Sequence, residues 1–197
     1  MDYRLEQWIN GPAGSHPVLD GVMTWVGADL LYVFVAVVVA WFLVGWWRGH
    51  PDDRRGAIAA GLALVAGLVV NFIIASVWAR PRPFVAHPTA VHLLLHHGRD
   101  ASFPSDHAVM TFAVAAVLFV HHRRLGALAL AAAALVCYAR VFVGDHYPGD
   151  VAAGAAIGVV AALLFSSWGT AVPAFLREMG DDIIRALHLP LREERGA

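Results

Sequence analysis

The sequence contains no lysine, and its fourteen basic residues are all arginine. Charged residues make up only 15% of the 197 residues, whereas hydrophobic residues make up 59%. The formal net charge is −1, so the chain lacks the positive excess that is typical of nucleic-acid-binding proteins. A soluble domain normally carries more charge, and this composition therefore indicates an integral membrane protein.

Cysteine is equally scarce. Cys137 is the single cysteine, so no disulfide can form within the chain, and its apolar neighbours favour a small core residue. Residues 1–27 lack a basic start followed by an apolar stretch, so we expect no cleavable signal peptide. The length suits one integral membrane domain over residues 1–197.

Residues 1–27 are predicted to lie at the membrane surface. Leu19, Val22, Met23 and Val26 recur at the spacing of one face of a helix. Glycines and prolines break the segment just before this stripe. The pattern predicts a short interfacial helix that lies on the bilayer.

Longer apolar stretches are predicted to cross the bilayer, because each approaches the ~20 residues that a core of roughly 30 Å requires. There are five of them, at residues 30–47, 56–79, 106–120, 125–143 and 146–172. The fold class is therefore all-α, a polytopic membrane helix bundle of about five transmembrane helices plus the N-terminal interfacial helix.

Other features refine this outline. Asn71 either packs against another helix or lines a site, and packing is favoured. Gly154 and Gly158 form a small-residue pair that predicts close helix contact. A short surface helix is expected at residues 91–95. Residues 173–197 mix arginine with acidic residues and are predicted to form a cytoplasmic tail.

The strongest chemical signal lies in residues 140–150, Arg-Val-Phe-Val-Gly-Asp-His-Tyr-Pro-Gly-Asp. Gly144 can end one helix and Asp145 can cap the next. We therefore place His146 at a helix start and Asp150 one turn further on, on the same face. In that position Asp150 can hold one imidazole nitrogen and leave the other free to attack, while the helix N-terminus attracts phosphate.

The loop at residues 80–105 supplies further polar groups. Arg80 and Arg82 open it, and with Arg140 they offer planar, bidentate donors for phosphate oxygens. Ser105 is a natural N-cap for the next helix. His107, in the first turn of that helix, can protonate a leaving group.

The predicted spans bring these groups to one face of the membrane, because ends of even spans and starts of odd spans share a side. The opposite side carries nine of the fourteen arginines, in two loops and the tail. The positive-inside rule then places the site and the N-terminus outside and the C-terminus in the cytoplasm.

With these residues in place, the chain resembles the type-2 phosphatidic acid phosphatase family, which is related to vanadium haloperoxidases. The family's three motifs are Lys-x6-Arg-Pro, Pro-Ser-Gly-His and Ser-Arg-x5-His-x3-Asp. The corresponding residues here are Ala75-x6-Arg82-Pro83, Pro104-Ser105-Asp106-His107 and Ala139-Arg140-x5-His146-x3-Asp150, in that order. The resemblance covers roughly residues 60–170.

This chain departs from the family pattern at three positions. Ala75 replaces the motif lysine, which removes a phosphate contact that Arg80 can replace. Asp106 replaces glycine and puts a carboxylate beside the phosphate site. Ala139 replaces serine, a smaller loss.

The resemblance implies a metal-independent lipid phosphatase that works through a phosphohistidine and needs no cofactor. By resemblance the catalytic residues are His146 as nucleophile, His107 as general acid and Asp150 as the partner of His146, and the phosphate-binding residues are Arg80, Arg82, Ser105, Asp106 and Arg140. The Phe-Pro-Ser-Asp-His sequence is similar to the corresponding motif of the bacterial undecaprenyl-diphosphatase branch. It implies a plasma-membrane enzyme that cleaves a polyprenyl diphosphate to the monophosphate to recycle the cell-wall carrier lipid. Phosphatidic acid and phosphatidylglycerol phosphate are the alternative substrates.

Two other functions fit parts of the sequence. His87, His92, His96 and His97 are close enough in sequence to suggest a metal-dependent hydrolase, but no His-Glu-x-x-His pattern accompanies them. An anionic-lipid transporter would use the arginines as a funnel. Transporters usually show repeated halves or broken helices at mid-membrane, whereas these polar groups cluster at span ends.

Overall fold

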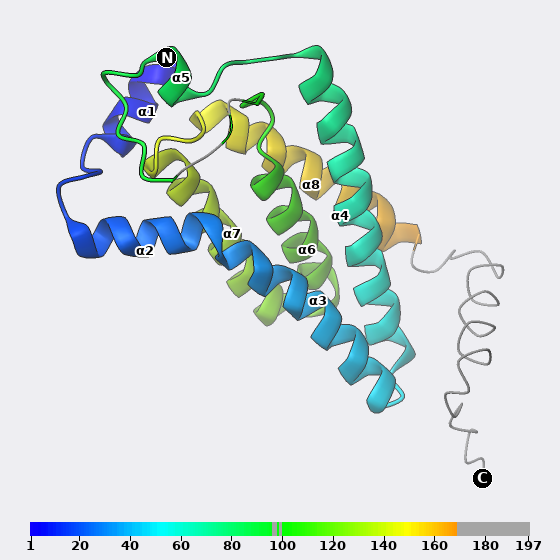
Figure 1. Ribbon diagram of the computed structural model, residues 1–197. Coiled ribbons are helices and arrows are strands. Elements are labelled where there is room, and N and C mark those ends of the chain that lie inside the picture. Colours follow the sequence, from blue (N-terminus) through cyan, green and yellow to red (C-terminus); the bar gives the residue numbers. More distant parts are fainter. Residues whose placement is uncertain (96–97, 99, 169–197) are drawn as a thin grey trace, which may run out of the picture.

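The computed structural model of the protein describes residues 1–95, 98 and 100–168, and every element of regular secondary structure among these residues is a helix. These residues form α1 (Asp2–Asn10), α2 (Pro17–Ala28), α3 (Leu30–Trp47), α4 (Pro51–Val77), α5 (Pro83–Ala86), α6 (Asp106–His121), α7 (Arg123–Phe142) and α8 (Pro148–Trp168) (Figure 1). The predicted all-α class is confirmed for this part of the chain. The predicted tail at residues 173–197 lies outside the described residues.

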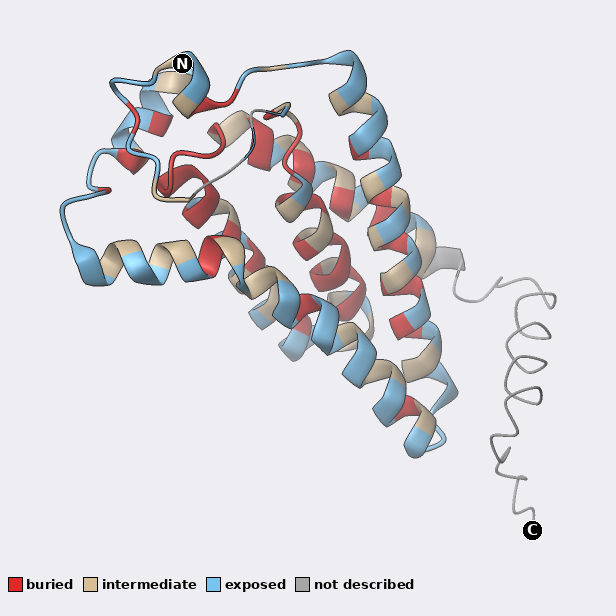
Figure 2. Cartoon of the chain, viewed as in Figure 1, coloured by how far each residue is buried: buried red, intermediate tan, exposed pale blue. Residues whose placement is uncertain are grey.

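Helix α6 is the centre of the bundle. It packs against α3, α4, α7 and α8, and Figure 2 shows buried residues concentrated along it. Most of its buried side chains are alanine or valine, which lets the neighbouring helices approach closely. The first turn of α6 is thereby fixed among the ends of the surrounding helices.

Two glycines bring α8 into backbone contact with α6. A Cβ atom at Gly154 would lie 2.4 Å from the carbonyl oxygen of Ser105, and one at Gly158 would lie 2.5 Å from that of Val109. Both distances are far shorter than van der Waals contact, so a larger residue would push the helices apart. The predicted close contact is confirmed, and it holds Ser105 against the first two turns of α8.

The outer surface of the bundle is apolar. Large hydrophobic side chains are exposed along four helices, among them Val39 on α3, Phe72 on α4, Leu128 on α7 and Leu163 on α8. Within the described residues, α3, α4, α7 and α8 are long and apolar enough to cross a membrane, and α6 is apolar but shorter. Exposed apolar surface on this scale is the mark of a protein that is surrounded by lipid, so the chain is a multi-pass helical membrane bundle.

The N-terminal segment contains two helices where one was predicted. Helix α2 includes the predicted stripe and buries Val26 against Val136 and Ala139 of α7. It runs across the direction of the bundle helices (Figure 1). Its position on the bilayer surface stays a prediction. Helix α1 was not predicted, and it packs against α7 and α8.

The predicted surface helix at residues 91–95 is wrong. This segment forms no helix, and the short helix of the loop is α5 instead. The backbone N–H of Leu94 donates to the Val143 carbonyl at 3.1 Å. The Asn10 side-chain amide donates to the His92 carbonyl and accepts from the His92 backbone N–H. These tertiary hydrogen bonds satisfy the backbone groups that a helix would otherwise pair.

Candidate active site

The candidate nucleophile lies in a turn between α7 and α8. Gly144 adopts a left-handed backbone with φ of +81°, and α7 ends just before it, as predicted. Helix α8 begins at Pro148, so His146 precedes the helix rather than starting it, and Asp150 lies in the first turn. The turn seals His146 in the protein, where it is 1% exposed.

The two ring nitrogens of His146 have different surroundings. Nδ1 lies 2.9 Å from the carbonyl oxygen of Ser102, which can only accept a hydrogen bond, so Nδ1 carries the proton. Nε2 therefore holds the lone pair, and it lies 3.3 Å from Nη1 of Arg82. Burial lowers the pKa of the His146 imidazole, which keeps the ring neutral near pH 7. A neutral imidazole with a fixed tautomer is suited to nucleophilic attack through Nε2.

Asp150 does not hold the imidazole directly, which corrects the expectation from the four-residue spacing. Its Oδ2 lies 3.7 Å from Nδ1 of His146, too far for a hydrogen bond. The carboxylate instead accepts hydrogen bonds from Ser102 Oγ at 2.5 Å, the Tyr147 backbone N–H at 2.9 Å and Arg80 Nη1 at 2.7 Å. Asp150 thus fixes Ser102, and the Ser102 carbonyl fixes His146.

Two buried guanidinium groups converge beside Nε2 of His146. Arg82 and Arg140 both pair with Oδ2 of Asp145, the former at 2.8 Å, and this oxygen lies 3.4 Å from Nε2. Asp145 is therefore an internal counter-ion and not the helix cap that the sequence suggested. An anionic oxygen at this point contacts both guanidinium groups and the nucleophile together, which is the geometry that a phosphate oxygen requires. An incoming phosphate must displace or share this carboxylate.

The start of α6 supplies a second set of polar groups. Ser105 occupies the N-cap position, but its hydroxyl makes no capping bond, and within the described residues this buried oxygen has no hydrogen-bond partner. Such an orphaned hydroxyl is available to a phosphate oxygen. Asp106 accepts a hydrogen bond from Nδ1 of His107 at 3.0 Å and therefore orients this histidine. The sequence had predicted a phosphate contact for Asp106 and had not predicted this role.

Arg80 is occupied by carboxylates. Its Nη1 contacts Asp150 and its Nη2 contacts Asp2, each at 2.7 Å, and its guanidinium lies 3.9 Å above the Tyr147 ring. These contacts favour a role in holding Asp150 over the predicted role as a phosphate ligand.

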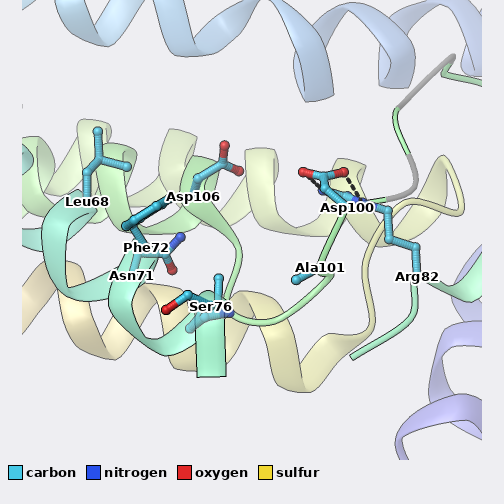
Figure 3. Close-up of a pocket in the computed structure, with 10 residues that line it drawn as sticks. Leu68, Asn71, Phe72, Ser76, Arg82, Asp100, Ala101 and Asp106 are labelled. Carbon is cyan, nitrogen blue, oxygen red and sulfur yellow. Dashed lines mark hydrogen bonds and ion pairs between the residues drawn. The ribbon is translucent and has the colours of Figure 1, made fainter. Parts of the chain in front are cut away.

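A cavity of about 470 Å³ extends from Arg82 and Asp106 to α4. Figure 3 shows Phe72, Asn71 and Ser76 of α4 on one side and Asp100, paired with Arg82, on the other. Phe72 is 74% exposed on the apolar outer surface, so the cavity connects that surface to the guanidinium. Asn71 lines the cavity, although the sequence favoured a packing role. Ala75 also lines it, so the position of the motif lysine here leaves open space.

The histidines of the loop have other contacts. His87 stacks on Tyr3 with ring centroids 3.7 Å apart, and His96 and His97 lie outside the described residues. Across residues 1–95, 98 and 100–168, no cluster of three His, Cys, Asp or Glu side chains is placed to hold a metal ion.

Sequence patterns missed Ser102 and the pairing of Asp145. Ser102 lies in a loop that carries no motif of its own at this position, and its link to His146 depends on the path of that loop. Asp145 carried one signal, its place next to His146, but a capping role explained it equally well.

Comparison with known families identifies the chain. Residues 56–173, more than half of its length, match the family model described as the PAP2 superfamily. The chain belongs to the PAP2 superfamily. The resemblance to type-2 phosphatidic acid phosphatases is thus confirmed, and the match begins after α1, α2 and α3.

Relatives and solved structures agree with this membership. Undecaprenyl-diphosphatase BcrC of Bacillus subtilis (strain 168) is 33% identical over 165 residues, which cover 84% of this chain and 82% of BcrC. The crystal structure of LpxE from Aquifex aeolicus has a TM-score of 0.69 at 26% identity and covers 83% of this chain and 93% of that one. A transmembrane PAP2-type phosphatidylglycerolphosphate phosphatase from Bacillus subtilis shares the fold, with a TM-score of 0.63 at 23% identity over 87% of this chain and 88% of that one.

Proposed function

We propose that this PAP2 protein is a metal-independent phosphatase of polyprenyl diphosphates that forms a phosphohistidine on His146. The observation that carries the proposal is the neutral, buried His146, whose Nε2 faces Arg82 and the Asp145 oxygen that Arg82 and Arg140 share. Positive charge beside a fixed nucleophile stabilises the equatorial oxygens of phosphorus in the transition state. The whole chain acts as one domain.

The reaction proceeds in two displacements. Nε2 of His146 attacks the terminal phosphorus, and the bond to the bridging oxygen breaks as the lipid monophosphate leaves with its electron pair. Water then attacks the phosphohistidine, the P–N bond breaks, and inorganic phosphate is released. His107, oriented by Asp106, gives a proton to the leaving oxygen in the first step and takes one from water in the second.

Two features support a lipid diphosphate over a soluble ester. The cavity joins the apolar surface at Phe72 to Arg82, so a prenyl chain can remain in the bilayer while its headgroup enters. The relative BcrC is named an undecaprenyl-diphosphatase, and 33% identity over most of both chains makes the same substrate class the best candidate. This activity fits recycling of the cell-wall carrier lipid.

A phosphate-release panel tests this function. Purified protein with a metal chelator is given undecaprenyl diphosphate, phosphatidic acid, phosphatidylglycerol phosphate and a soluble phosphate ester. We expect the highest kcat/KM for the prenyl diphosphate and activity that survives chelation. Higher kcat/KM for phosphatidic acid would overturn the substrate and leave the mechanism standing. Absence of phosphate release from every substrate would favour a transporter.

We further propose that α6 is a fifth span and that the site faces the outside of a bacterial plasma membrane. Central burial explains why α6 can be shorter than the lipid-facing helices. The arginine-rich ends of the bundle then lie in the cytoplasm.

This topology predicts opposite labelling of two single cysteines in a Cys137→Ala background. Thr89→Cys lies in the exposed loop near the site, and Asp52→Cys lies at the other end, where the Asp52 side chain is 87% exposed. A membrane-impermeant maleimide should label Thr89→Cys in intact cells and Asp52→Cys only after permeabilisation. Labelling of both in intact cells would contradict an odd number of spans between residues 52 and 89, and reversed labelling would contradict the orientation alone.

A further inference from the structure

Both ends of helix α1 are hydrogen-bonded to the segment between α7 and α8 that contains His146. Helix α1 nevertheless lies outside the segment that matches the superfamily. At one end, Oδ1 of Asp2 accepts a hydrogen bond from the Gly149 backbone N–H at 2.9 Å. At the other, the Asn10 amide donates to the Phe142 carbonyl at 2.7 Å. These two hydrogen bonds therefore lie on either side of His146 in the sequence.

The spacing along α1 makes this arrangement possible. Asp2, Glu6 and Asn10 recur at intervals of one helical turn and therefore share one face. Glu6 and Asn10 are fully buried in the contact, whereas Leu5 and Trp8 on other faces are exposed. The face that carries Asp2, Glu6 and Asn10 is thus turned toward the protein, and its contacts with Phe142 and Gly149 are hydrogen bonds.

A continuous chain of hydrogen bonds joins Asp2 to the nucleophile. Oδ2 of Asp2 contacts Arg80 Nη2 at 2.7 Å, and Arg80 Nη1 contacts Asp150 Oδ1 at 2.7 Å. Asp150 Oδ2 accepts from Ser102 Oγ at 2.5 Å, and the Ser102 carbonyl accepts from Nδ1 of His146 at 2.9 Å. Two of these contacts join opposite charges, which makes them stronger and more directional than neutral hydrogen bonds.

We infer that α1 is a positioning element of the active site and that Asp2 is a positioning residue, acting through Arg80 and Asp150 to hold the proton on Nδ1 of His146. This inference rests on the proposed phosphatase function. It also assigns Arg80 to the support of the nucleophile instead of to phosphate. Asp2 and Arg80 are about one-third exposed, so solvent weakens their contact and the effect of losing it is moderate.

Asp2→Asn tests the inference. The asparagine oxygen can still accept from Gly149, but its amide group presents a donor to Arg80 where the carboxylate presented an acceptor. We expect kcat for the prenyl diphosphate to fall about 10-fold while KM stays within about twofold, because Asp2 does not touch the substrate. Gln7→Ala is the matched control, since Gln7 is exposed and its side chain bonds to Tyr3 of the same helix.

A double-mutant cycle with Arg80→Gln separates positioning from general destabilisation. If Asp2 acts through Arg80, adding Asp2→Asn to Arg80→Gln changes kcat by less than about twofold. If the fall in kcat of the double variant equals the product of the falls in the two single variants, the inference is overturned. A rise in KM with unchanged kcat in Arg80→Gln would also overturn it, because that result assigns Arg80 to phosphate binding.

The tautomer of His146 provides a readout that does not need turnover. Nitrogen-15 NMR of histidine-labelled protein reports the fraction of His146 with its proton on Nδ1, and Asp2→Asn should lower this fraction while Gln7→Ala leaves it unchanged. An unchanged tautomer with unchanged kcat contradicts the role of α1 alone. A wild-type protein that releases no phosphate contradicts the proposed function, whereas the NMR comparison still decides the role of Asp2.

Discussion

Replacement of His146 by alanine should abolish phosphate release, with a fall in kcat of at least about 10³-fold. The imidazole is the group whose lone pair faces the shared oxygen site of Arg82 and Arg140, so its removal leaves no nucleophile to form the covalent intermediate. A substrate with a labelled terminal phosphate, quenched rapidly in alkali, should leave label on wild-type protein and none on His146→Ala. Vanadate, which mimics five-coordinate phosphorus, should inhibit the wild type.

His50→Ala is the control for this experiment. His50 lies before α4, at the end of the bundle away from the site, and its side chain is 60% exposed. We expect its activity and its protein-bound label to match those of the wild type. Near-normal activity in His146→Ala would rule out the phosphohistidine route, whatever the substrate.

Asp150→Asn should lower kcat about 100-fold, which corresponds to about 2.7 kcal/mol of transition-state stabilisation. The fully buried Asp150 carboxylate accepts hydrogen bonds from Arg80, Ser102 and the Tyr147 N–H. The NH2 group of an asparagine would face one of these three donors and could not accept its hydrogen bond. KM should stay within about threefold, because Asp150 supports Ser102 and makes no contact with the Arg82–Arg140 site. Rates with the prenyl diphosphate and helix content by circular dichroism check both statements.

The pH profile adds an independent check on Asp150→Asn. Burial already lowers the pKa of His146, while the nearby Asp150 carboxylate raises it by favouring the imidazolium. Loss of that negative charge lowers the pKa further, so the acid limb of kcat/KM should move to lower pH in the variant. An acid limb that moves to higher pH would contradict the placement of Asp150 beside the imidazole.

Asp106 shows how a substitution in a family motif can acquire a local partner. The motif glycine has no side chain, whereas Asp106 binds Nδ1 of His107 and accepts the His107 backbone N–H. Adjacency in sequence made this pairing possible, whereas the position of Asp106 in the motif predicted a contact with phosphate. Asp106 and Arg82 both line the cavity into which the proposed lipid headgroup enters.

Local chemistry of the sequence was sufficient to predict the helical membrane class, the end of α7 at Gly144 and a close helix contact at Gly154 and Gly158. Each depends on composition or on spacing within one helix, where backbone geometry determines which side chains share a face. The same rules placed Asp150 close to His146, but they could not decide whether the two side chains bond directly. A difference of less than 1 Å separates a hydrogen bond from the observed 3.7 Å.

Tertiary structure alone decided the partners of the site residues. Ser102 reaches His146 from a loop 44 positions earlier in the chain, and Asp2 reaches Gly149 across 147 positions. Neither contact follows from a repeating pattern, because the path of the loop at residues 80–105 and the docking of α1 are fixed by the hydrogen bonds that they make after the long helices have packed. The sequence by itself therefore determined that the chain is a helical membrane protein with phosphatase motifs. The packing of α1 and of the loop at residues 80–105 decided which acceptor holds the His146 proton and which carboxylate pairs with each arginine.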